Sequence, residues 1–138
     1  MYQAIVVGTD GSETAAIAVS HATELAKLTG ATLHIVSAYP FEAVDIGKAA
    51  ESERICSRAW AEAEREGVKV QTHVRAGDAA DVLIAAVEET RADLLVLGNR
   101  GMTGMKRFVL GSVPNKVSHR SPCNLLIVDT TSASAGSG

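Results

Sequence analysis

Short apolar runs alternate along the chain with longer segments in which apolar residues recur every three or four positions. The short runs predict strands, and the longer segments predict amphipathic helices. The expected strands cover residues 4–8, 31–38, 68–75, 94–97 and 124–128, and the expected helices cover residues 13–28, 49–66, 78–87 and 112–119. Each strand but the last is followed by a helix, which is typical of parallel strands joined by right-handed crossovers.

This order predicts an α/β fold with a single doubly wound, Rossmann-like open sheet of five parallel strands in the order 3-2-1-4-5, with helices on both faces. Residues 4–8 are apolar on both sides of the strand, so we place them near the centre of the sheet. Residues 68–75 alternate apolar and polar positions, which indicates an edge strand. Ligands of such sheets bind at the carboxyl ends of strands where the winding reverses, so Asp10 and Gly98 are expected to face one another there.

Helix ends and single side chains add local expectations. Ser12, Asp78 and Ser112 each stand directly before or at the start of an expected helix, where such residues cap free N–H groups. Asp10 has a structural alternative to ligand binding, because it could share the capping of the first helix with Ser12. On the second helix, we expect Trp60 to pack down against the sheet, with a contact to a partner surface as the alternative.

Length and composition agree with one domain in residues 1–129, followed by a disordered Ser/Ala/Gly tail in residues 130–138. The chain has 138 residues, of which 46% are apolar and 4% aromatic, so Ala, Val, Leu and Ile must build the core. A net charge of −3 argues against general nucleic-acid binding. Cys56 and Cys123 form no CxxC pair, and no apolar run has the length of a membrane span, so we expect a cytoplasmic protein without membrane contact.

The stretch from Gly98 to Pro114 carries the candidate chemistry. It follows an apolar strand, and it contains four glycines, at Gly98, Gly101, Gly104 and Gly111. Glycine lets a backbone turn tightly and approach a ligand closely, and a following helix start would present free N–H groups. Five basic residues and no acidic one lie between residues 98 and 120: Arg100, Lys106, Arg107, Lys116 and Arg120. Together these features predict an anion site, most plausibly for phosphate.

Other residue types indicate no further site. The four histidines lack metal-ligand spacing, and His34 is expected to be a hydrogen-bonded core residue. No Gly-Lys-Ser/Thr ends the glycine loop, which excludes a Walker A motif, and no Gly-x-Gly-x-x-Gly follows the first strand. Asp10 has no second carboxylate or arginine that must act with it, so we predict ligand binding with slow phosphate hydrolysis at most.

The pattern Gly98-x2-Gly101-x9-Gly111-Ser112, placed after a first strand that ends in Asp10, resembles the nucleotide-binding branch of the universal stress protein family. The resemblance extends from the opening Val-Val-Gly-Thr-Asp-Gly-Ser to the closing Leu-Leu-Ile-Val, nearly the full chain apart from the tail. It implies a stress-response protein that binds ATP with Mg²⁺ and acts by nucleotide-dependent regulation. It also implies a homodimer that pairs through the last strand, Asn124 to Val128.

The resemblance assigns roles to eight positions. Asp10 matches the acidic residue near the adenosine and, indirectly, near the metal bound to the phosphates, and Thr9 lies beside it. The main chain of Ile35 matches the position that meets the adenine edge. The remaining matches are to ribose and phosphate contacts: Gly98, Gly101, Gly111, Ser112 and Val113.

Three functions therefore remain open at the level of the sequence. The first is an ATP-binding homodimer whose nucleotide occupancy alters its shape or partners. The second is a sensor or buffer that binds cyclic AMP on the same scaffold, because some relatives with a similar Gly-Asn-x-Gly loop favour that ligand. The third is a weak ATPase or a protein-interaction module that has lost its ligand.

Overall fold

One parallel sheet forms the centre of the molecule. The structure, a computed structural model, describes residues 1–41, 46–99 and 111–130. Within these ranges the strands are β1 (Ala4–Gly8), β2 (Thr32–Tyr39), β3 (Val70–Ala76), β4 (Leu94–Gly98) and β5 (Asn124–Val128). They are paired in parallel in the order β3-β2-β1-β4-β5. The predicted fold class and strand order are confirmed, and the strand at residues 70–76 lies at an edge as expected.

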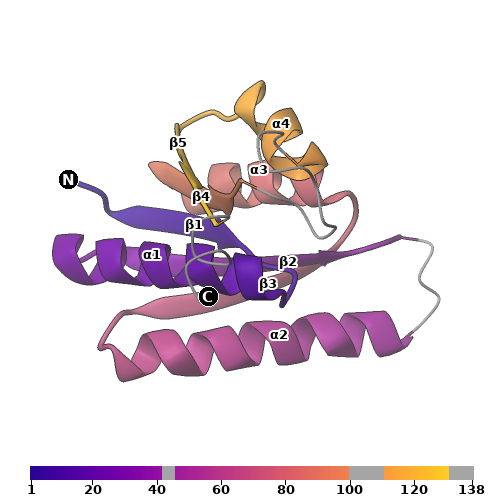
Figure 1. Ribbon diagram of the computed structural model, residues 1–138, viewed down its shortest axis with the longest axis horizontal. Coiled ribbons are helices and arrows are strands. Elements are labelled where there is room, and N and C mark those ends of the chain that lie inside the picture. The colour runs from indigo at the N-terminus through magenta and orange to yellow at the C-terminus, as the bar shows by residue number, and fades with distance from the viewer. Residues whose placement is uncertain (42–45, 100–110, 131–138) are drawn as a thin grey trace, which may run out of the picture.

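The helices cover both faces of this sheet (Figure 1). They are α1 (Glu13–Thr29), α2 (Ile46–Arg65), α3 (Ala79–Thr90) and α4 (Ser112–Ser118). Helices α1 and α2 pack on one face, and α3 and α4 pack on the other. No helix in the described part of the chain is both long enough and apolar enough to cross a membrane.

Two hydrophobic cores, one on each face, follow from the alternation of side chains along the strands. Ile5, Val7 and Ile35 point toward α1 and α2, where they are fully buried. Their neighbours Val6 and Val36 point toward α3 and α4. Consecutive residues of a strand therefore belong to different cores.

Most helix ends lie where the sequence places them. The Ser12 hydroxyl accepts a hydrogen bond from the N–H of Ala15 at 3.1 Å, and Asp78 accepts one from the N–H of Asp81 at 3.2 Å. The cap of α4 differs from the prediction, because Gly111 is its N-cap and no side chain caps it. Ser112 is the first residue inside that helix rather than its capping residue.

Helix α2 is longer at its start than expected, since it begins at Ile46 rather than at Ala49. A glycine lowers helix stability by only about 1 kcal/mol relative to alanine, so Gly47 does not end the helix. The buried residues Cys56 and Ala63 hold α2 to the sheet. Trp60 does not pack down as expected, because it lies at the margin of this stripe with 37% of its surface exposed.

The third strand begins at Val70 rather than at Val68 because residues 66–68 complete the end of α2. Gly67 has a φ of 80°, and the N–H of Val68 bonds to the carbonyl of Ala63 at 3.4 Å. The C-terminal end also differs from the sequence prediction. Thr130, the first residue of the expected disordered tail, is 0% exposed, and residues 131–138 lie outside the described ranges.

Candidate functional site

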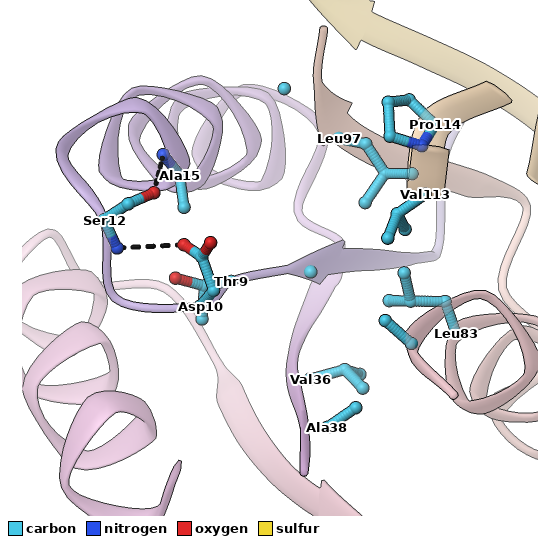
Figure 2. Close-up of a pocket in the computed structure, with 13 residues that line it drawn as sticks. Thr9, Asp10, Ser12, Ala15, Val36, Ala38, Leu83, Leu97, Val113 and Pro114 are labelled. Atoms are coloured by element: carbon cyan, nitrogen blue, oxygen red, sulfur yellow. Dashed lines mark hydrogen bonds between the residues drawn. The ribbon is translucent and has the colours of Figure 1, made fainter. Parts of the chain in front are cut away.

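A pocket opens at the carboxyl ends of β1, β2 and β4, where the direction of winding reverses between β1 and β4 (Figure 2). Asp10 and Gly98 both line it, as predicted from the strand order. The lining comes from five parts of the chain: the end of β1 with the loop into α1, the end of β2, the start of α3, the end of β4 and the start of α4. The site therefore exists only in the folded chain, because these five parts are separated in the sequence and meet only at this edge of the sheet.

The polar wall of the pocket is the loop from β1 into α1, and hydrogen bonds hold its shape. The Asp10 Oδ1 atom accepts a hydrogen bond from the N–H of Ser12 at 2.9 Å, and the Thr9 hydroxyl accepts one from the N–H of Gly11 at 3.1 Å. The N–H of Thr9 donates to the carbonyl of Val36 at 2.9 Å, which fixes the loop to β2. Asp10 thus holds the loop before α1, but it does not share the helix cap as its alternative interpretation supposed, because the Ser12 side chain makes that cap.

The second Asp10 carboxylate oxygen, Oδ2, has no hydrogen-bond partner among the described residues. Asp10 is also the only carboxylate among the described residues that line the pocket. No group of three or more His, Cys, Asp or Glu side chains in the described part of the chain could hold a metal ion by itself. Asp10 can therefore offer one oxygen to the water shell of a metal that arrives with a ligand, which is what an indirect metal contact requires.

The other wall is apolar and was not foreseen. Val36 and Ala38 come from β2, Leu83 from α3, Leu97 from β4 and Val113 from α4 (Figure 2). Wide apolar surfaces with a few polar groups at one side are typical of pockets for small molecules with a ring. The signal was present in the sequence, because Val36 and Ala38 share one face of a strand and point away from Ile35.

The structure brings together four of the eight residues proposed from the sequence. Thr9, Asp10, Gly98 and Val113 line the pocket. Ile35 does not, since it is 0% exposed and its side chain belongs to the core under α1 and α2. The other three predicted residues divide as follows: Gly111 is buried just before α4, Ser112 is exposed in its first turn, and Gly101 lies outside the described residues.

Two of the five basic residues counted in this stretch are paired with carboxylates in the described part of the chain. Lys116 lies 3.6 Å from a carboxylate oxygen of Asp78, and Arg120 lies 2.7 Å from one of Asp81. Lys116 on α4 and Arg120 just beyond its end therefore connect this part of the chain to the start of α3, and their charges are partly compensated there. The other basic residues of this stretch fall outside the described ranges: Arg100, Lys106 and Arg107.

Two histidines form a hydrogen-bonded pair on β2 and β3, away from the pocket. His34 Nδ1 lies 3.0 Å from His73 Nε2, and His34 is 7% exposed, which confirms the prediction of a satisfied core histidine. Burial lowers the pKa of His34, and the neighbouring His73 lowers it further. Burial also lowers the pKa of His73, with a further decrease from Arg75 that is opposed by Glu89.

This pair should make the protein less stable in acid. Because the folded-state pKa of each histidine is below the unfolded value of about 6.5, the unfolded chain binds more protons below that pH. The stabilisation that the neutral pair provides should therefore be complete above about pH 6.5, and the free energy of unfolding should fall as the pH drops below that value. Urea unfolding at pH 7.5 and pH 5.5 measures the loss, which we expect to be smaller in His73→Gln than in the parent.

His21→Gln is the control for this experiment, since His21 is exposed on α1. It should show the same loss between the two pH values as the parent protein. A His73→Gln variant with an unchanged loss would show that the pair does not set the acid sensitivity.

Comparison with known proteins gives a consistent result over nearly the whole chain. Residues 1–129 match the family model for the Universal stress protein family. Universal stress protein Rv1636 from Mycobacterium tuberculosis is 38% identical over 94% of this chain and 98% of the relative. Universal stress protein MJ0531 from Methanocaldococcus jannaschii is 31% identical over 93% of this chain and 82% of the relative. A universal stress protein solved in complex with cAMP is similar with a TM-score of 0.79 and 36% identity, covering 94% of this chain and 98% of that one.

Proposed function

Because the chain belongs to the universal stress protein family, we propose that it binds an adenine nucleotide, first of all ATP with Mg²⁺, in the pocket between β1 and β4. The meeting of an apolar wall and a polar wall at the switch point of the sheet carries this proposal. A purine base needs a flat apolar surface, whereas ribose and phosphates need hydrogen-bonding groups. The two walls supply these in one continuous pocket.

In this proposal the base lies against Val36, Ala38 and Leu83. Thr9 and Asp10 face the ribose, and the free Oδ2 atom of Asp10 is directed to the magnesium ion at the phosphates. The phosphates extend toward the two ends of the glycine stretch, which supply the remaining predicted contacts: Gly98, Gly101, Gly111, Ser112 and Val113. The contact of the Ile35 main chain with the adenine edge stays a prediction, and the residues of that strand that line the pocket are Val36 and Ala38.

Cyclic AMP is the second candidate ligand. A relative of 36% identity has been solved in complex with cAMP. Cyclic AMP carries one phosphate charge and needs no metal, whereas ATP carries several charges. Among the described residues, Lys116 pairs with Asp78 and Arg120 pairs with Asp81. These two positive charges are therefore partly compensated, and a ligand of low charge fits this arrangement.

The proposed role is regulation rather than rapid catalysis. Nucleotide occupancy would alter the shape or partners of a cytoplasmic homodimer during stress, with slow hydrolysis at most. Support for the dimer comes from β5, an edge strand on which Leu126 is 36% exposed. An uncovered apolar edge strand readily pairs with a second copy of itself. Two free cysteines, Cys56 and Cys123, fit a reducing compartment.

Calorimetric titration with ATP, with ATP and Mg²⁺, and with cyclic AMP tests the proposal. We expect the parent to bind, and we expect Asp10→Asn to weaken Mg²⁺-ATP about tenfold, because a charged oxygen near the metal is lost. Asparagine keeps the side-chain oxygen that accepts from Ser12, so the loop should retain its shape. Binding of cyclic AMP should change much less in this variant.

Glu62→Gln, on the exposed side of α2, removes one negative charge far from the pocket and serves as the control. It should bind every ligand as the parent does. Absence of binding to either nucleotide by the parent would contradict the proposed function. Preference for cyclic AMP, unaffected by Mg²⁺, would select the second candidate.

A further inference from the structure

We propose that Asn99 is a positioning residue of the nucleotide site, and that it holds the phosphate end of the pocket in place by its contacts with the C-terminal end of β5. This inference rests on the proposed function, because it concerns how that site keeps its shape. Asn99 follows Gly98, the last residue of β4, and Gly98 lines the pocket. The strand pattern does not explain why the polar side chain at this point makes several hydrogen bonds.

The Asn99 side chain bonds to the two residues that follow β5. Its Oδ1 atom accepts one hydrogen bond from the N–H of Thr130 at 3.1 Å and another from the Thr130 hydroxyl at 2.9 Å. Its Nδ2 group donates to Asp129 Oδ1 at 3.3 Å. The backbone N–H of Asn99 also donates to the carbonyl of Val128 at 2.9 Å. These four contacts fix the end of β4 against the end of β5.

The Asn99 carbonyl bonds to the other neighbouring segment, the start of α4. It accepts a hydrogen bond from the N–H of Gly111 at 3.0 Å. Gly111 is the N-cap of α4, and Val113, two residues later, lines the pocket. One residue therefore sets the distance between Gly98 and the start of α4, which are the two places where the phosphates are proposed to lie.

Thr130 makes this arrangement testable. It is 0% exposed, although the sequence pattern places it at the start of a disordered tail. Its N–H and its hydroxyl both bond to Asn99 Oδ1, and it is not among the residues that line the pocket. A change at Thr130 can therefore reach a bound ligand only through its neighbours, of which Asn99 is the one bonded to its side chain.

The competing explanation is that Asn99 and Thr130 only stabilise the end of β5. The two explanations differ in which part of the ligand is affected. Adenosine would contact the apolar wall and the Thr9–Asp10 loop, whereas the phosphates would contact Gly98 and the start of α4. Loss of positioning should weaken ligands that carry phosphate more than adenosine, whereas general loss of stability has no such selectivity.

The experiment compares Thr130→Val with Thr130→Ser. Valine has nearly the shape of threonine but lacks the hydroxyl, and serine keeps the hydroxyl. Calorimetry with adenosine, Mg²⁺-ATP and cyclic AMP should show that Thr130→Val weakens the nucleotide that the parent prefers about fivefold, which is the size expected for one buried hydrogen bond. Its affinity for adenosine should stay within about twofold, and Thr130→Ser should bind like the parent.

Thr23→Val is the matched control. Thr23 is also a buried threonine, at 8% exposure, but its hydroxyl donates to the carbonyl of Val19 within α1, and Thr23 is not among the residues that line the pocket. This variant should lose comparable stability and keep the parent affinity for nucleotide. Thermal unfolding of all variants without ligand measures that stability.

Two results would overturn the inference while leaving the proposed function in place. One is a Thr130→Val variant that binds the nucleotide as the parent does. The other is an equal loss for adenosine and nucleotide, which would assign Asn99 and Thr130 a structural role alone. A parent protein that binds no adenine nucleotide would overturn the proposed function and this inference together.

Discussion

Replacing Ala38 with tryptophan should abolish binding of ATP and of cyclic AMP alike. Ala38 is half-buried at the end of β2, and its side chain faces the pocket next to Val36 and Leu83 (Figure 2). An indole ring there would occupy the apolar wall on which the base is proposed to lie. We expect at least about a hundredfold loss of affinity, because the ligand would lose both its contact area and its access.

The protein should still fold, since the added ring enters the open pocket rather than a filled core. Ala61→Trp, on the exposed side of α2, introduces the same side chain away from the pocket and should bind nucleotide as the parent does. Calorimetry measures the affinities, and circular dichroism with a thermal melt confirms folding. Parent-like binding by Ala38→Trp would place the base elsewhere.

The architecture could be predicted because it depends on patterns that are local in the sequence. Apolar runs separated by helical periods predicted each strand and helix, and the alternating polarity at residues 68–75 predicted an edge. Boundaries were less accurate where a neighbouring element decides them. Helix α2 extends back to Ile46 because a single glycine, Gly47, costs too little to end a helix. Trp60 is 37% exposed because it lies beside the buried stripe of that helix.

The site was predicted only in part, because its walls depend on contacts between distant segments. Asp10 and Gly98 were placed together from strand order alone. The apolar wall required knowing which face of β2 meets α3, and this distinguishes Val36 from Ile35. The ion pairs of Lys116 with Asp78 and of Arg120 with Asp81 likewise join distant segments, so a count of basic residues along the chain does not show them.

Replacing Gly11 with alanine should cost the protein about 2–4 kcal/mol of unfolding free energy, for two separate reasons. Gly11 lies between Asp10 and Ser12 and has a φ of 82°, which a residue with a side chain adopts only with strain. A Cβ atom at this position would also lie 2.8 Å from Cγ1 and 2.9 Å from Cδ1 of Ile55 on α2. The loop that shapes the polar wall is therefore confined both by its own backbone and by a helix packed against it.

A double-mutant cycle with Ile55→Ala separates these two costs. Removing the Ile55 side chain relieves the contact but not the backbone strain, so Gly11→Ala should cost about 1–2 kcal/mol in the Ile55→Ala background. Urea unfolding of the four proteins gives the values. Equal costs in both backgrounds would show that Ile55 does not confine the loop, and a Gly11→Ala variant as stable as the parent would contradict the left-handed conformation itself. Because Asp10 and Ser12 flank the position, Gly11→Ala should also weaken nucleotide binding at temperatures where the variant remains folded. Ile55→Ala alone should leave the loop conformation and the nucleotide affinity of the protein close to those of the parent.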